Sequence, residues 1–127
     1  MMDGAITDTN EAVHAAAVTY CEAVFKARED VFETLCHDAF HMVCADDQQV
    51  WDKAAYLARV TARDAAEGDP VYEIFDINVD GDMARVKLRV AVPGVMFEDY
   101  LGFICVDGAW KLINKLFRDV TSQSAAS

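Results

Sequence analysis

Serine is almost absent from this chain. It occurs only at Ser122, Ser124 and Ser127, close to the C-terminus, so the body of the protein offers no serine for Ser-His-Asp catalysis. The sequence also lacks a glycine-rich phosphate loop and a nucleophile elbow. These absences argue against serine hydrolases and phosphate-loop proteins, and we predict no cofactor.

Basic residues are scarce as well. Lysine and arginine number 11 against 22 aspartates and glutamates, which gives a net charge of −11. Nucleic acids and anionic membranes require clustered basic side chains, so we expect neither as a partner. No apolar run approaches the ~20 residues of a membrane span, and the N-terminus has no basic-then-apolar signal pattern. We therefore expect a cytoplasmic protein.

Metal and disulfide chemistry have weak support. The four cysteines form no CxxC motif and lie far apart, at Cys21, Cys36, Cys44 and Cys105. Without a secretory signal they are most simply buried thiols, and their pairing cannot be assigned. His37 and His41 have the i, i+4 spacing of a helical zinc site, but a turn and a strand are expected there. We predict no metal site.

The remaining composition favours a folded domain. The chain has 127 residues, of which 54% are hydrophobic, enough for one domain with a real core. We predict a single domain over residues 1–127, ordered from about 8 to 120, with irregular ends at 1–7 and 121–127. Apolar spacing and the N-cap candidate Asp52 predict three helices and an early strand. Their ranges are 9–28, 31–36 and 53–66 for the helices and 40–44 for the strand, followed by a polar loop at 45–50.

The segment from Val71 to Val120 predicts a four-stranded antiparallel meander. Its apolar runs are separated by three turn signals, Asp80-Gly81, Pro93-Gly94 and Asp107-Gly108. Asp-Gly between alternating apolar residues is a strong hairpin signal. A helical half followed by a meander indicates an α+β fold.

A two-residue turn at Asp107-Gly108 would set the register of the last hairpin. Tyr100 would then face Lys115 and Glu98 would face Phe117, all on one face of the sheet. Both faces are largely apolar under this register, so both need a cover. The helices can cover one face. A second copy of the chain is the simplest cover for the other, and we expect a homodimer through the sheet.

Several local runs add a family resemblance. Tyr20 through Asp30 resembles the first helix and helix break of the nuclear-transport-factor-2-like superfamily, and Leu35 through Ala39 resembles the run after its second helix. Asp107 through Ile113 resembles its final hairpin. Ile113-Asn114-Lys115-Leu116-Phe117 is especially similar to the branch called "putative lumazine-binding", which is close to the SnoaL-like polyketide cyclases. The resemblance covers residues 8–120, approximately.

This resemblance implies a cone-shaped α+β barrel, with three N-terminal helices packed on a curved, mainly antiparallel sheet. It also implies an apolar pocket between the long helix and the concave face, and dimerisation through the convex face. In the family's ketosteroid isomerases, a first-helix tyrosine and a protonated aspartate on the third meander strand form an oxyanion hole, and an early-strand carboxylate is the base. Tyr20 matches the tyrosine. The other two positions fall near Gly102 and Val43, so steroid-type isomerisation is not expected.

Two ionisable residues are candidates for acid/base chemistry. His41 shares a strand face with Val43, and an imidazole exchanges protons readily near neutral pH; the alternative is a partly exposed or hydrogen-bonded strand histidine. Lys115, opposite Tyr100 and near Glu98, would form an ionisable cluster in an apolar cavity. The alternative is a Lys-Glu pair at the rim or at the dimer contact.

Three functions are therefore kept open. The first is a small-molecule-binding protein with an apolar pocket for a planar or hydrophobic metabolite. The second is a cyclase, isomerase or dehydratase that uses His41 or Lys115 as acid/base. The third is a non-catalytic homodimeric interaction module. The aromatic candidates could equally be ordinary core residues. The predicted ligand-binding set is Tyr20, His41, Trp51, Tyr56, Tyr100, Lys115 and Phe117.

Overall fold

The described part of the chain forms three helices and six strands. The computed structural model describes the backbone of residues 2–121 and the side chains of residues 9–121. The predicted ends at 122–127 lie outside the described residues. In chain order the elements are α1 (Met2–Lys26), α2 (Glu29–Leu35), β1 (Cys36–Cys44), β2 (Val50–Asp52), α3 (Lys53–Thr61), β3 (Tyr72–Asp80), β4 (Met83–Val92), β5 (Val95–Val106) and β6 (Ala109–Asp119).

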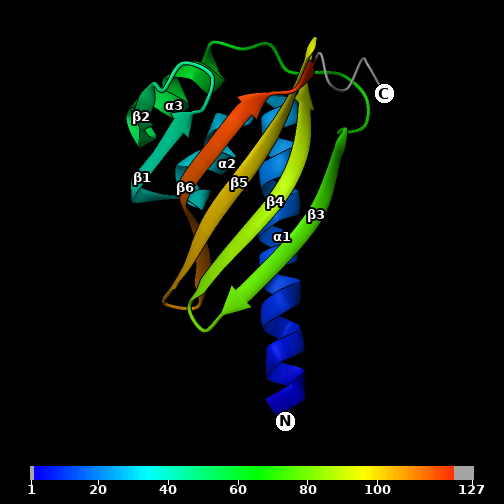
Figure 1. Cartoon of the computed structure of the whole chain (residues 1–127), viewed down its shortest axis with the longest axis vertical. Helices are drawn as coiled ribbons and strands as arrows, with labels where there is room; N and C mark the ends of the chain where they lie inside the picture. The colour runs from blue at the N-terminus through cyan, green and yellow to red at the C-terminus, as the bar shows by residue number, and fades with distance from the viewer. Residues whose placement is uncertain (1, 122–127) are drawn as a thin grey trace.

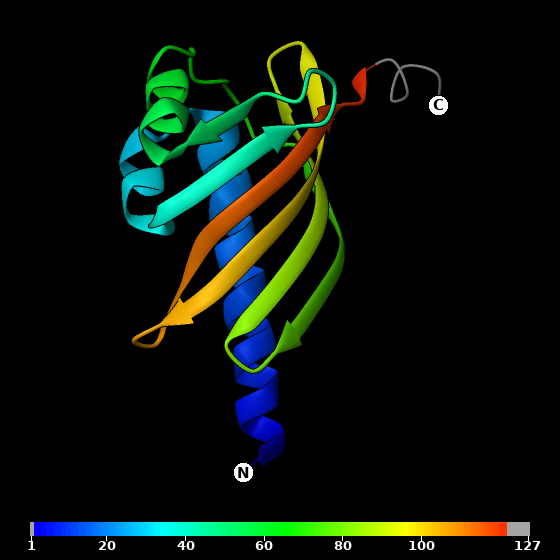
Figure 2. The ribbon, with the colours of Figure 1, turned by 60° about the vertical axis from the view of Figure 1, so that its left-hand side comes forward.

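The strands form one curved sheet in the order β2-β1-β6-β5-β4-β3. Only β1 and β6 pair in parallel; the other neighbours are antiparallel. Figures 1 and 2 show α1 running along the concave face of the sheet, with α2 and α3 grouped near β1 and β2. The sheet is not closed, because β2 and β3 are its two edges. The predicted cone-like α+β fold is confirmed.

Helix α1 holds the core together. Its buried residues Val13, Ala17, Tyr20 and Val24 recur every three or four positions, so they form one stripe that packs against β3, β4 and β6. The helix begins at Met2, and the prediction that residues 1–7 lack regular structure is therefore wrong for residues 2–7. Within residues 2–121, no helix is both long and apolar enough to cross a bilayer.

The second half of the helical region positions the site. Asp52 is the N-cap of α3, since its Oδ1 accepts a hydrogen bond from the Ala55 N–H at 2.9 Å. The predicted cap is confirmed, although α3 ends at Thr61 rather than near residue 66. The sequence does not predict strand β2. This strand begins at Val50 and pairs with β1 over three residues. The pairing places Trp51, the middle residue of β2, beside the cavity described below.

The meander turns follow the predicted chemistry. Asp107 and Gly108 have φ values of 50° and 82°, and Val106 pairs with Ala109 across the turn. Two consecutive positive φ values are the requirement of a type I′ turn, the commonest two-residue hairpin connection. The hairpins at Asp80-Gly81 and Pro93-Gly94 also form where the sequence predicts them.

A β-bulge changes the register of the last hairpin. Pairing runs as predicted from Val106 and Ala109 to Phe103 and Leu112, but Gly102 then pairs with Asn114, which leaves Ile113 as the extra residue. Each residue of β6 beyond the bulge is consequently on the face opposite to the predicted one.

Pairing beyond the bulge shows the consequence. Lys115 faces Leu101, and Leu116 faces Tyr100. The predicted pairing of Tyr100 with Lys115 is therefore wrong, because side chains alternate strictly and a one-residue slip exchanges the two faces.

We expect Asp107→Pro to destabilise the protein by about 2 kcal/mol or more. Proline fixes φ near −65°, whereas this turn position has a φ of 50°. Urea unfolding of the variant measures the loss. Asp107→Asn is the matched control, since asparagine tolerates positive φ, and its stability should stay within about 0.5 kcal/mol of the wild type. A variant with proline and unchanged stability would contradict the turn assignment.

Candidate functional site

A cavity of about 230 Å³ lies at the end of the sheet where α3 and β2 meet the β4–β5 turn. Both the helical layer and the concave face of the sheet contribute to its wall, which is mainly apolar and aromatic. Its lining residues are Val24, Met42, Trp51, Tyr56, Arg59, Arg63, Val92, Pro93, Val95, Phe97, Lys115 and Phe117.

Aromatic rings form one wall of the cavity. Phe117 of β6 lies between Trp51 and Phe97, with ring centres 6.3 and 5.6 Å away. The guanidinium of Arg59 covers the Trp51 indole at 4.4 Å from the ring centre, which is a favourable cation–π distance. This arrangement produces a flat, polarizable surface beside an exposed cationic side chain.

Lys115 is the one buried cation among the described residues, with 6% of its surface exposed. Its Nζ lies 4.7, 4.9 and 5.3 Å from the ring centres of Phe117, Tyr56 and Tyr20. The same Nζ donates to the Tyr56 hydroxyl at 3.4 Å. Burial raises the pKa of Tyr56, and the positive charge of Lys115 opposes that effect. The rings therefore form a box that stabilises a positive charge away from water.

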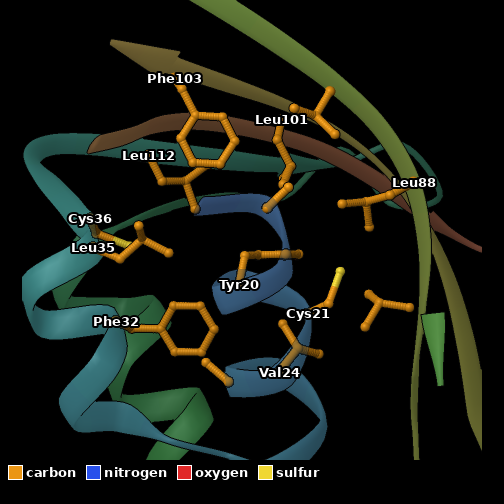
Figure 3. Close-up of a cluster of buried hydrophobic side chains, with 14 of the residues drawn as sticks. Tyr20, Cys21, Val24, Phe32, Leu35, Cys36, Leu88, Leu101, Phe103 and Leu112 are labelled. Carbon is orange, nitrogen blue, oxygen red and sulfur yellow. The ribbon is translucent and has the colours of Figure 1, made fainter. Parts of the chain in front are cut away.

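A buried tyrosine–aspartate pair lies behind this box. The Tyr20 hydroxyl donates to Asp99 Oδ2, and both residues are fully buried. Figure 3 shows Tyr20 within the apolar cluster formed by α1, α2 and the sheet. Burial raises the pKa of Asp99, whereas Lys115 and the Tyr20 hydrogen bond act in the opposite direction. Burial and the Asp99 charge raise the pKa of Tyr20 well above its ordinary value.

Asp99 is the site residue that sequence reasoning missed. It lies on β5, the third meander strand. The family resemblance places the corresponding aspartate near Gly102, three positions after Asp99. The prediction that the position matching the family's aspartate falls near Gly102 therefore overlooked the carboxyl that meets Tyr20. A signal was present, because Phe97, Leu101 and Phe103 alternate toward the concave face and Asp99 falls in the same series.

Two predicted site residues lie on the outer face of the sheet. His41 is exposed, because its neighbours Phe40 and Met42 are buried on the concave side. Tyr100 is 50% exposed and pairs with Leu116 on the same outer face. The prediction that both point into one cavity with Tyr20 and Lys115 is wrong. Strand alternation turns His41 and Tyr100 outward, and the bulge in β6 moves Lys115 to the face opposite Tyr100.

The other predicted residues gather around the cavity. Trp51, Tyr56, Lys115 and Phe117 line it directly, and Tyr20 lies one layer deeper, in ring contact with Lys115. Lys115 and Phe117 reach this face only because of the bulge in β6.

The four cysteines and the candidate zinc ligands His37 and His41 do not line this cavity. All four cysteines are free, and burial raises the pKa of the Cys36 thiol to about 12. Over the described part of the chain, no three His, Cys, Asp or Glu side chains come together as metal ligands would.

Comparison with known proteins supports the architecture. The family described as "Putative lumazine-binding" matches residues 8–118. No curated protein matches the sequence. An NTF2-like protein of unknown function from Silicibacter pomeroyi DSS-3 is 22% identical, with a TM-score of 0.83, over 90% of this chain and 98% of that one.

Two further solved structures are similar at lower identity. An NTF2-like protein of unknown function from Shewanella baltica OS155 is 14% identical, with a TM-score of 0.80, over 89% of this chain and 94% of that one. A ketosteroid isomerase-like protein from Erwinia carotovora atroseptica SCRI1043 is 13% identical, with a TM-score of 0.70, over 87% and 95%. At these identities the likeness shows a shared fold and does not transfer an activity. The fold is that of these NTF2-like structures, and the family model shows that the chain belongs to the "Putative lumazine-binding" family.

Proposed function

We propose that the protein binds a small, planar and largely apolar molecule in the cavity beside Trp51. The observation that carries the proposal is the combination of an aromatic wall with a buried, precisely held cation, Lys115, inside about 230 Å³ of space. Ligand sites in proteins typically join apolar walls to a few polar groups that fix orientation. The family's description makes lumazine, a flat bicyclic compound, a reasonable first probe.

The geometry favours binding over catalysis. Of the two proposed acid/base residues, His41 is exposed on the outer face and only Lys115 lines the cavity. Tyr20 and Asp99 are hydrogen bonded to each other and fully buried, so neither meets a ligand in this arrangement. An isomerase or dehydratase would have to rely on Lys115 for proton transfer. The cavity volume argues against a module whose interior is filled by its own side chains.

We also propose that two copies associate through the outer face of the sheet. Several large apolar side chains are exposed on that face, which is unusual for a surface in water. Three of them, Met83, Tyr100 and Leu116, line a shallow hollow at Gly102, where Asn114 lies against the glycine backbone. The exposed residues are Phe75, Met83, Tyr100 and Leu116.

Fluorescence of Trp51 tests the binding function. The chain has two tryptophans, and Trp110 does not line the cavity, so Trp110→Phe leaves Trp51 as the reporter. We expect lumazine or naphthalene derivatives to change its emission with saturation. Val95→Phe, which adds bulk to the cavity lining, should weaken binding about tenfold or more. A Trp51 signal that no planar aromatic compound changes would contradict the proposed function.

A further inference from the structure

The charges around the cavity run against those of the whole chain. The protein has a net charge of −11, yet the cavity lining contains three cations, Arg59, Arg63 and Lys115, and no aspartate or glutamate among the described residues. A concave surface lined by one sign of charge and apolar walls concentrates a potential of that sign. The cavity is thus a positive site on an acidic protein.

These cations have no ion-pair partner among the described residues. Within the described part of the chain, the ion pairs of lysine and arginine involve other residues, and Arg59, Arg63 and Lys115 form none. Arg63 Nε is buried and has no hydrogen-bond partner there. Buried donors are nearly always satisfied in folded proteins, so Arg63 has unused hydrogen-bonding capacity in the wall of the cavity.

The three cations differ in exposure. Arg59 is exposed, Arg63 is half-buried and Lys115 is buried. An anion bound at Lys115 would therefore be withdrawn from water, whereas one bound at Arg59 alone would not. Asp99, a buried acid, is hydrogen bonded to Tyr20 and lies beyond ion-pair distance of Lys115. Among the described residues, the Lys115 ammonium group makes one hydrogen bond, the long contact to Tyr56.

We infer that the ligand of this cavity is an aromatic carboxylate, whose flat body packs on Trp51 and Phe117 and whose carboxylate meets Lys115 and Arg63. The inference rests on the proposed binding function and adds the charge of the ligand to it. Both cations can donate charge-assisted hydrogen bonds to a carboxylate, which are stronger than neutral ones. The aromatic rings around Lys115 exclude water and hold the ammonium in place, so little reorganisation accompanies binding.

A pair of probes that differ only in charge tests the inference. The probes are 2-naphthoate, which is ionised at neutral pH, and 2-naphthamide, which has the same shape and no charge. Binding to the full chain carrying Trp110→Phe is followed through Trp51 fluorescence. We expect naphthoate to bind at least about tenfold more tightly than naphthamide, and added sodium chloride to narrow the difference.

Two charge-removing variants locate the effect. Lys115→Met and Arg63→Gln should each reduce the preference for naphthoate severalfold while leaving naphthamide binding nearly unchanged. Arg85→Gln is the matched control, because it removes the same charge from an exposed residue of β4 that does not line this cavity. It should keep the full preference. Circular dichroism checks folding, and Arg63→Gln, at a half-buried position, tests the inference even if Lys115→Met does not fold.

The outcomes separate the two proposals. Equal binding of both probes by the wild type, or a preference that survives Lys115→Met and Arg63→Gln, overturns the anion inference and leaves the binding function standing. If neither probe changes the Trp51 signal, the anion inference and the proposed function both fail.

Discussion

Tyr20→Phe is expected to destabilise the protein by about 2 to 3 kcal/mol at neutral pH. The substitution keeps the ring and removes only the hydroxyl that donates to Asp99 Oδ2. Asp99 Oδ1 already has no hydrogen-bond partner among the described residues. The variant therefore leaves a fully buried carboxyl group without any donor that the structure shows, and urea unfolding measures the cost.

The loss should depend on pH. Burial raises the pKa of Asp99 in the folded chain above its ordinary value of 3.8, so the folded protein retains this proton where the unfolded chain has released it. The stabilising contribution is therefore complete below that value and is lost as the pH rises through the folded-state pKa. The Tyr20 hydrogen bond lowers this pKa. Removing it raises the pKa further, and the destabilisation should be larger at pH 8 than at pH 5.

Tyr56→Phe is the matched control for this prediction. Tyr56 is also buried, but its hydroxyl has a single long contact of 3.4 Å from Lys115 Nζ. Loss of that hydroxyl should cost about 1 kcal/mol or less. Asp99→Asn combined with Tyr20→Phe should recover part of the stability at pH 8, because the ionisable group is gone. Equal costs for the two tyrosine variants, at both pH values, would show that Asp99 does not depend on Tyr20.

Replacing Tyr100 and Leu116 together by glutamate is expected to convert the proposed homodimer into monomers. The two residues pair across β5 and β6 and are 50% and 48% exposed on the outer face. In a dimer through this face, four added carboxylates would be buried without partners, which is strongly unfavourable. We expect the dissociation constant to rise at least about a hundredfold. Sedimentation velocity at micromolar concentration distinguishes the two states.

Glutamates placed elsewhere give the control for charge alone. Ala58 lies in α3 and Ala62 directly follows it. Both are exposed, and both lie away from the outer face of the sheet. The pair Ala58→Glu and Ala62→Glu adds the same charge and should leave the dimer intact. A wild-type protein that sediments as a monomer at micromolar concentration would contradict the proposed association, whatever the variants do.

The sequence by itself determined the elements and their order, except for strand β2. The stripe of Val13, Ala17, Tyr20 and Val24 predicts α1 because helical spacing is local and repeats over many residues. Asp52 predicts the start of α3 because a cap needs only its own neighbours. Asp107-Gly108 predicts a turn because only a few residue pairs accept two positive φ values. In each case the physical requirement lies within a few residues of the signal, so it can be read without knowing the fold.

Only the tertiary structure decided which side chains meet in the cavity. The strand around Ile113 is apolar at consecutive positions, so its alternation does not show where an extra residue enters the ladder between β5 and β6. That single residue places Lys115 on the concave face, opposite to the face of Tyr100. Asp99 acquires its role in the same way, because Tyr20 is 79 residues away in sequence and meets it only after α1 packs on the sheet. Local patterns specify the elements, whereas the chemistry of the site depends on register and packing between distant segments.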